Sequence, residues 1–335
     1  WFDLERVSVE EALAARGIGG ALSPRSAANL DRAFAAADAF ARAPGGPLAD
    51  VQRRFLRSAA SVMWLQDDAQ AARSLDSLAG HAHADALDAM HRDAADASAR
   101  LDARLARQEY ATGSSAWTLS PRAAPAGRQL AGGATSGVDQ WLSPRLLVGG
   151  SVSDGRASLG FDRMGGFAQG EASRAGLHVH YRGSGWHATA AAGAGRARLD
   201  LRRPIELGAA GRHSALSRRE LDLGFAHGEL GRALHAGGGS LVPFVALDYA
   251  LVRGNAFVEQ GDTGFELAAG RSRQWRLRAA AGARYARAWS IGRQALWLEL
   301  DARYRRDLVE GEPVRAAFLG VPDAAFDLPA WRGSE

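Results

Sequence analysis

The chain has 335 residues, no cysteine, and 41 basic residues that are all arginine. Disulfides and cysteine-based metal or nucleophile chemistry are therefore excluded. The formal net charge is only +4, and charged residues alternate with apolar ones, whereas a nucleic-acid-binding protein gathers its charge on one face. The sequence contains no apolar run of the roughly eighteen residues that a transmembrane helix needs.

The first part of the chain, residues 1–108, has alanine, leucine and charged residues at helical spacing. It does not open with a signal peptide, so we expect its first residue to be a mature or trimmed end. A Pro-Gly-Gly-Pro run at 44–47 separates two predicted helices. A longer helical stretch is predicted over about 75–108, where alanine is frequent and large apolar side chains are few. Such a helix suits a narrow polar tube better than a conventional core.

From about Tyr110 onward, the period of the apolar pattern changes from 3.6 to two. In 294–305, apolar residues occupy one face of a predicted strand and mostly charged residues occupy the other. Strands are predicted at 110–119, 132–142, 145–159, 174–181, 186–201, 219–230, 241–252, 274–288 and 294–305. Longer inserts are predicted at 161–170, 204–216 and 254–273, and a long loop or strand base at 318–335.

This alternation predicts an antiparallel transmembrane β-barrel with an apolar outer face, a polar lumen and aromatic residues near the strand ends. Leu247, Tyr249, Leu296, Leu298 and Tyr304 are expected to face lipid. The opposite strand face should line the lumen with charges that pair across it or hold the helix: Glu220, Asp222, Asp248, Arg276, Arg278, Arg284, Glu299, Asp301, Arg303 and Arg305.

Two histidine pairs, His81 with His83 and His178 with His180, raise the question of a metal site. Metal binding needs a third and a fourth ligand held in geometry, and the sequence offers no clear candidates. We interpret the second pair as polar lumen lining and the first as a solvated helix face.

Catalytic residues are not evident either. Ser151 follows two glycines, but its surroundings are not those of a nucleophile elbow, and we place it within a strand. His213, Asp262 and Glu266 lie in predicted loops and are interpreted as solvated. The sequence therefore predicts no catalytic residue, no cofactor, no metal and no enzymatic activity for this chain.

Several segments resemble the translocator of type V (classical) autotransporters. Residues 75–84 are similar to that family's Leu-x-x-Leu-Ser-Gly-x-x-His/Tyr-Ala stretch before the barrel. Residues 135–142 resemble its early Gly-x-Asp strand, and residues 318–326 resemble its late Phe-x-Gly-x-Pro-x-x-x-Phe loop. The opening residues 2–8 resemble the junction that follows subtilisin-like serine protease passengers.

The resemblance implies a translocator in the outer membrane of a Gram-negative bacterium, which exports an N-terminal passenger to the cell surface and anchors it. It implies three parts: a helical junction over 1–74, a linker helix in the lumen over 75–109, and the barrel over 110–335. The implied partners are outer-membrane lipid, the passenger, the barrel-assembly machinery and periplasmic chaperones, and no nucleic acid. The family barrel has twelve strands, so the C-terminal strands are expected to be missing.

Other functions compatible with this pattern are a stand-alone barrel, either a small porin or an outer-membrane hydrolase, and a soluble β-sandwich adhesin with a helical stalk. The leucine-rich and aromatic outer face argues against the soluble adhesin.

Overall fold

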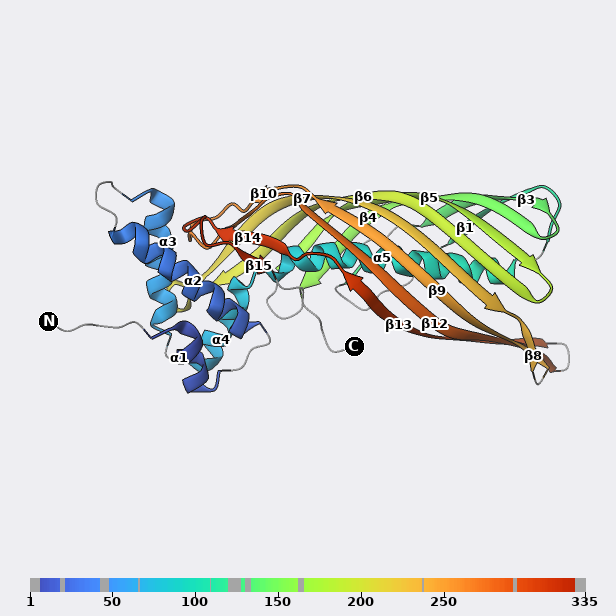
Figure 1. The fold of residues 1–335 in the computed structure, drawn as a ribbon, viewed down its shortest axis with the longest axis horizontal. Coiled ribbons are helices and arrows are strands. Elements are labelled where there is room, and N and C mark those ends of the chain that lie inside the picture. Colours follow the sequence, from blue (N-terminus) through green and yellow to red (C-terminus); the bar gives the residue numbers. More distant parts are fainter. Residues whose placement is uncertain are drawn as a thin grey trace.

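The computed structural model describes residues 7–18, 22–42, 48–65, 67–108, 110–119, 128–129, 134–161, 166–236, 238–291 and 294–328. Within these ranges, helices come first and a sheet of long antiparallel strands follows, with a small second sheet at one end (Figure 1). The helices of this part of the chain are all too short or too polar to cross a membrane.

Four helices form a bundle at one end of the molecule (Figure 1): α1 (Val9–Arg16), α2 (Ser23–Arg42), α3 (Asp50–Met63) and α4 (Asp68–Leu78). Side chains at the N-termini of α1 and α4 cap these two helices. The Ser8 hydroxyl accepts a hydrogen bond from the Glu11 N–H at 3.0 Å, and the Glu11 carboxylate accepts one from the Ser8 N–H. The Asp67 carboxylate accepts from the Gln70 N–H at 2.6 Å, which caps α4.

The fifth helix, α5 (His81–Arg107), leaves this bundle and lies along the inner face of the large sheet (Figure 1). The sequence predicted one helical stretch over 75–108, and this is wrong, because the chain breaks at Gly80. Gly80 has φ of +68°, and a Cβ there would lie 2.5 Å from the Leu267 side chain. Only glycine fits this left-handed, crowded position without strain.

The large sheet has antiparallel neighbours in this order: β1 (Ser114–Leu119), β3 (Thr135–Ser143), β4 (Leu146–Phe161), β5 (Gly166–Gly183), β6 (Trp186–Glu206), β7 (Arg212–Arg232), β9 (Gly239–Gly254), β12 (Ser272–Ile291) and β13 (Gln294–Glu310). Short strands pair with two of them: β2 (Arg128–Gln129) with β4, and β8 (Leu234–Ala236) with β9. The predicted antiparallel β fold with N-terminal helices is confirmed.

The edge strands β1 and β13 do not pair with each other within the described residues, so the sheet is open there. Both strands run away from the end at which short turns join β3 to β4 and β5 to β6. Because antiparallel neighbours alternate in direction, only an odd number of strands between β1 and β13 could close the sheet with antiparallel pairs. We call the end with these short turns the turn end, and the end with α1–α4 the mouth.

At the mouth there is a small sheet, made of β10 (Phe257–Val258), β11 (Leu267–Ala269), β14 (Val314–Phe318) and β15 (Phe326–Leu328), and a single-turn helix, η1 (Gly208–Ala210). Of these, β10, β11 and η1 lie within segments predicted as loops. The inserts predicted at 161–170 and 204–216 are largely wrong, because β5, β6 and β7 continue through much of them.

The strands invert their polarity part-way along their length. On β6, the outward residues from Trp186 to Ala194 are apolar, and the next outward residues are Arg196, Arg198, Asp200 and Arg202. The inward residues change in the opposite sense, from His187 and Thr189 to the buried Leu199 and Leu201.

The inversion falls at the same register on six neighbouring strands. The last small or apolar outward row is Trp275, Leu251, Gly224, Ala194, Ala175 and Val152. The next outward row is polar: Arg273, Arg253, Asp222, Arg196, Ser173 and Asp154.

The apolar part of β9 has the length of a membrane crossing. It runs over 241–251, which matches the about 9–11 residues that a tilted barrel strand needs, whereas the apolar part of β4 is shorter, over 146–152. Aromatic side chains lie at both borders: Tyr181 and Trp186 at the turn end, and Tyr249 with Trp275 toward the mouth, their rings 6.4 Å apart. Lipid therefore surrounds the half of the sheet nearest the turn end, and the mouth half projects into water.

An arginine introduced inside the apolar band should be far more destabilising than one introduced beyond it. Leu247→Arg, on the outer face of β9 within the band, should cost about 2–4 kcal/mol of unfolding free energy. Gln169→Arg, on the outer face of β5 beyond the band, should change it by less than about 0.5 kcal/mol. Denaturant unfolding in lipid bilayers measures both, and equal costs would show that the band is placed wrongly.

Candidate functional site

The candidate site is the space enclosed by the inward strand faces, which α5 occupies. The helix packs against β5, β6, β7 and β9 (Figure 1). Small side chains allow this close approach, and those buried along α5 include Ala82, Ala86, Ala89, Ala94, Ala95 and Ser98. Near its C-terminus, Leu101 and Leu105 pack with Trp141 and Leu147 at the turn end of the sheet.

Ion pairs join α5 to the inward strand faces along its length. Nitrogen–oxygen distances are 2.6 Å for Asp88 with Arg276, 2.7 Å for Asp93 with Arg174, 2.9 Å for Asp96 with Arg305 and 2.7 Å for Arg107 with Glu299. Arg104 also pairs with the buried Asp139. Burying a charge is costly unless it is paired, so these contacts let a charged helix lie in the lumen.

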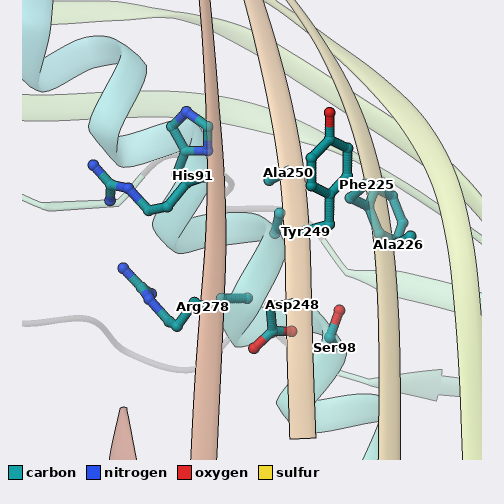
Figure 2. Close-up of a pocket in the computed structure, with 11 residues that line it drawn as sticks. His91, Ser98, Phe225, Ala226, Asp248, Tyr249, Ala250 and Arg278 are labelled. Carbon is teal, nitrogen blue, oxygen red and sulfur yellow. The ribbon is translucent and has the colours of Figure 1, made fainter. Parts of the chain in front are cut away.

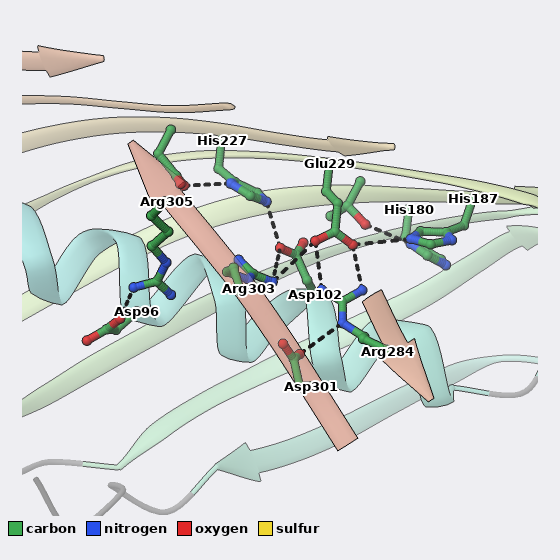
Figure 3. Close-up of polar contacts among 12 residues, drawn as sticks. Asp96, Asp102, His180, His187, His227, Glu229, Arg284, Asp301, Arg303 and Arg305 are labelled. Atoms are coloured by element: carbon green, nitrogen blue, oxygen red, sulfur yellow. Dashed lines mark hydrogen bonds and ion pairs between the residues drawn. The ribbon is translucent and has the colours of Figure 1, made fainter. Parts of the chain in front are cut away.

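A larger network lies around Asp102 of α5 and Glu229 of β7 (Figure 3). Arg284 donates from both terminal nitrogens to the Glu229 carboxylate, each at 2.7 Å, and Arg303 lies 3.4 Å from it. His227 lies between two carboxylates, 2.8 Å from Asp102 and 2.7 Å from Asp248.

Beside α5 there is a small cavity, so the helix does not fill the lumen completely. Figure 2 shows His91 and Ser98 of α5 facing Asp248 and Arg278 of the strands across it. The Arg278 guanidinium also donates to Asp307 at 2.6 Å. Arg278 lines this cavity and is only 13% exposed, so α5 shields it while the helix is in place.

The structure separates the residues predicted to line the lumen into two groups. Glu220 and Asp222 lie on the outer strand face, where they pair with Arg198 and Arg196, so that prediction is wrong for them. At this level the inward positions belong to the buried Leu221 and Leu223. The other predicted residues lie on the inward face or in pairs that reach it: Asp248, Arg276, Arg278, Arg284, Glu299, Asp301, Arg303 and Arg305.

The histidine pairs have protein partners. His178 lies 2.9 Å from Asp139, and His180 lies 3.0 Å from the Thr189 hydroxyl. His81 and His83 are buried, so their interpretation as a solvated helix face is wrong. Within the described ranges, groups of three or more His, Asp or Glu side chains placed to hold a metal ion are absent.

The predicted loop residues differ in burial. His213 and Asp262 form a partly exposed pair at 3.0 Å. Glu266 is buried instead of solvated, because its carboxylate accepts hydrogen bonds from the Thr263 and Gly264 N–H groups at 2.8 and 2.7 Å and shapes the turn before it.

A comparison with protein families identifies this arrangement. The family model of the autotransporter β-domain matches residues 111–331. The chain belongs to the autotransporter β-domain family. It is therefore the outer-membrane translocator part of a type V secretion system of Gram-negative bacteria, and the translocator itself is not catalytic.

The described autotransporter sheet is also similar to a solved one. The translocator domain of autotransporter NalP from Neisseria meningitidis matches with 16% sequence identity and a TM-score of 0.45, covering 55% of this chain and 65% of that domain. The match thus spans less than two thirds of the length of the NalP domain. A search of curated proteins finds no match.

Sequence reasoning missed several residues of the autotransporter lumen. His227 and Glu229 lie in a predicted strand, but placing Glu220 and Asp222 inward assigned the odd-numbered residues of that strand to the outer face. A slip of one residue exchanges the two faces of a strand. The alternation of His227 and Glu229 with the apolar Leu230 would have placed these two residues on the inward face and Leu230 on the outward face.

A second polar cluster fixes α5 at the mouth; this mouth cluster consists of His83, Arg203, Arg219 and Glu259. Arg203 donates to both oxygens of the Glu259 carboxylate, at 2.9 and 2.5 Å. His83 lies between the Glu259 carboxylate at 2.8 Å and the Arg219 guanidinium at 3.1 Å. An N–H on Nε2 of His83 therefore donates to Glu259, while Nδ1 accepts from Arg219.

The mouth cluster lies beyond the lipid-facing band, and three of its residues have lowered pKa values: His83, Glu259 and Arg219, whose pKa burial lowers to about 10. Burial lowers the pKa of His83 to about 4, and Arg219 and Arg203 add to this against the opposing Glu259 carboxylate. Burial would raise the pKa of Glu259, but the Arg203 charge and hydrogen bonds from Arg203 and His83 outweigh it and hold the pKa at about 2. His81, two residues before His83, also has its pKa lowered to about 4, by burial and by the charge of Arg203.

Acid should loosen the mouth cluster. Below about pH 6.5, His83 binds a proton in the unfolded chain but stays neutral in the folded protein, so the unfolding free energy falls as the pH drops toward 4. Glu259 is protonated more readily in the unfolded chain, so it lowers the unfolding free energy further as the pH drops from about 4.5 toward 2. We expect the distance distribution between spin labels on Ala60→Cys and Gln169→Cys to broaden at pH 4.5. His83→Gln should remove much of this change, and identical distributions at pH 7.5 and 4.5 would contradict it.

Removing the acid of the central lumen network should be costly. Glu229→Gln removes the buried carboxylate nearest to Arg284 and Arg303, leaves them with the partly exposed Asp301 and with Asp102 at 4.0 Å, and should lower the unfolding free energy by about 3 kcal/mol. Glu220→Gln breaks an exposed pair and should cost less than about 1 kcal/mol. Denaturant unfolding in bilayers measures the difference, and equal costs would show that the network contributes little.

Proposed function

We propose that this chain exports an N-terminal passenger and anchors it, and that α5 is the linker that follows the passenger through the lumen and stays there as a plug. The observation that carries this proposal is the helix itself. It lies along the inward strand faces, and its Asp and Arg side chains pair with strand residues of opposite charge. A stand-alone porin would need an open lumen where α5 lies.

The direction of the chain supports the same proposal. Barrels of the outer membrane have short turns on the periplasmic side and longer loops outside. The short turns lie at the C-terminal end of α5, and α1–α4 with the small sheet lie at the other end (Figure 1). The chain therefore passes from the cell surface through the lumen along α5 and enters β1 from the periplasmic side.

The finer assignments are proposals as well. We propose a helical junction over 1–74, a lumen linker over 75–109 and a barrel over 110–335. The resemblance of residues 2–8 to the junction after subtilisin-like passengers supports a serine peptidase as the passenger. The barrel-assembly machinery and periplasmic chaperones are the partners that a protein of this family needs to reach the membrane.

Replacing α5 tests the plug. A Gly/Ser sequence of equal length in place of residues 81–107 keeps the connection from α4 to β1 but removes the helix and its ion pairs. In the folded, membrane-inserted protein, Arg278→Cys should then react with a water-soluble thiol reagent added from the turn end at least about tenfold faster. The chain has no other cysteine, so the signal is clean.

Gln169→Cys, on the outer surface beyond the lipid band, serves as the control and should react equally in both forms. An Arg278→Cys that reacts equally fast with and without α5 would place the helix outside the lumen.

A further inference from the structure

The bundle α1–α4 shares one apolar core with the mouth half of the strands. One buried cluster contains inward strand residues from beyond the lipid band and residues of the bundle. The strand residues include Leu199, Leu201, Leu221 and Val252, and the bundle residues include Leu30 of α2 and Leu75 and Leu78 of α4. Because the outer strand face is charged at this level, the bundle and the strand ends together resemble a water-soluble domain with a single core.

An aromatic group locks α3 into this core. Phe55 lies fully buried, with its ring centroid 4.8 Å from that of Phe265 and 6.3 Å from that of Phe318. A Cβ on Gly264 would lie only 2.5 Å from an atom of Phe55, and one on Gly320 only 2.2 Å, so the backbone at both glycines touches Phe55. The contacts of Phe55 therefore tie α3 to two segments that are far apart in the sequence.

The mouth cluster ties the junction of α4 and α5 to the same place. Arg203 of β6 donates to the Ser77 carbonyl of α4 at 2.8 Å and to the Phe265 carbonyl at 2.9 Å. His83, in the first turn of α5, pairs with Glu259 and stacks on Phe257 with ring centroids 3.9 Å apart. These contacts hold the start of α5 independently of the ion pairs deeper in the lumen.

We propose that α1–α4 form a latch, which folds on the mouth after it has passed through the lumen and prevents α5 from sliding back. A lumen that one helix occupies cannot pass a folded four-helix bundle, so the bundle must cross unfolded and fold outside. Once folded, it blocks the return of the chain until its shared core comes apart. This inference rests on the proposed function, because it requires that the chain moves outward through the lumen.

The latch predicts that the passenger joins the chain before α1 and that the bundle stays at the cell surface when a passenger is released there. The plug would then have two attachments: ion pairs with the strands in the lumen, and the folded latch at the mouth. Opening of the latch alone should let α5 move while the strands remain folded.

Phe55→Ser tests the latch in the folded, membrane-inserted protein, and Met63→Ser, at an exposed position of the same helix, is the matched control. Phe55→Ser should make trypsin cleavage within α3 at least about tenfold faster and should produce channel openings under voltage in planar bilayers. Met63→Ser should leave both measurements as in the parent protein.

Two outcomes would overturn the latch: an α3 in Phe55→Ser that resists trypsin like the parent, or a cleaved α3 with a channel that stays as quiet as the parent. The Gly/Ser replacement of α5 separates this failure from that of the proposed function. If that replacement exposes Arg278→Cys while Phe55→Ser leaves the channel quiet, α5 is a plug without a latch. If Arg278→Cys stays equally reactive, the plug itself is refuted.

Discussion

The pairing of charges between α5 and the inward strand faces is the interaction on which the lipid-embedded half of this protein depends. Asp88 and Asp93 would be buried without partners if the helix lay in an apolar lumen, and Arg174 and Arg276 supply the opposite charges that the helix needs there. Helix and strands therefore specify each other. The alanines of α5 let its backbone lie close to the strands, and the opposite charges pair across this short distance. Together they explain how a polar helix can remain in a lumen surrounded by lipid.

The inversion of polarity along the strands explains the remaining half. Beyond the row that contains Trp275 and Ala194, charges move to the outer face and leucines to the inner face, so the strands leave the membrane and begin to act as the wall of a soluble core. That core needs a cover, and α1–α4 supply it. The same strands thus form a membrane barrel on one side of this row and the base of a surface domain on the other. This exchange of the polar and apolar faces explains why the strands are much longer than a membrane crossing.

Much of the fold could be predicted from the sequence, because period-two alternation and glycine-rich turns are local signals. The strand centres, the helical start and the barrel class follow from them. The inward phase of β7 could not, because Glu220 and Asp222 are charged yet face water outside the membrane, and charge alone does not distinguish a wet lumen from a wet outer surface. The mouth cluster was also beyond reach, since it joins His83 to Arg203, Arg219 and Glu259 across sequence separations that no local pattern encodes.

The most direct test of a lumen helix is a chemical crosslink across one of its ion pairs. In Asp93→Cys with Arg174→Cys, the charged groups that lie 2.7 Å apart are replaced in a chain without natural cysteine, and a bifunctional thiol reagent with the reach of the two lost side chains should join the cysteines in intact outer membranes. Arg196→Cys with Asp222→Cys, directly opposite each other on the outer face of β6 and β7, is the positive control. Crosslinking of both pairs is the expected result. A control that crosslinks while the 93–174 pair stays unlinked would show that α5 does not lie in the lumen.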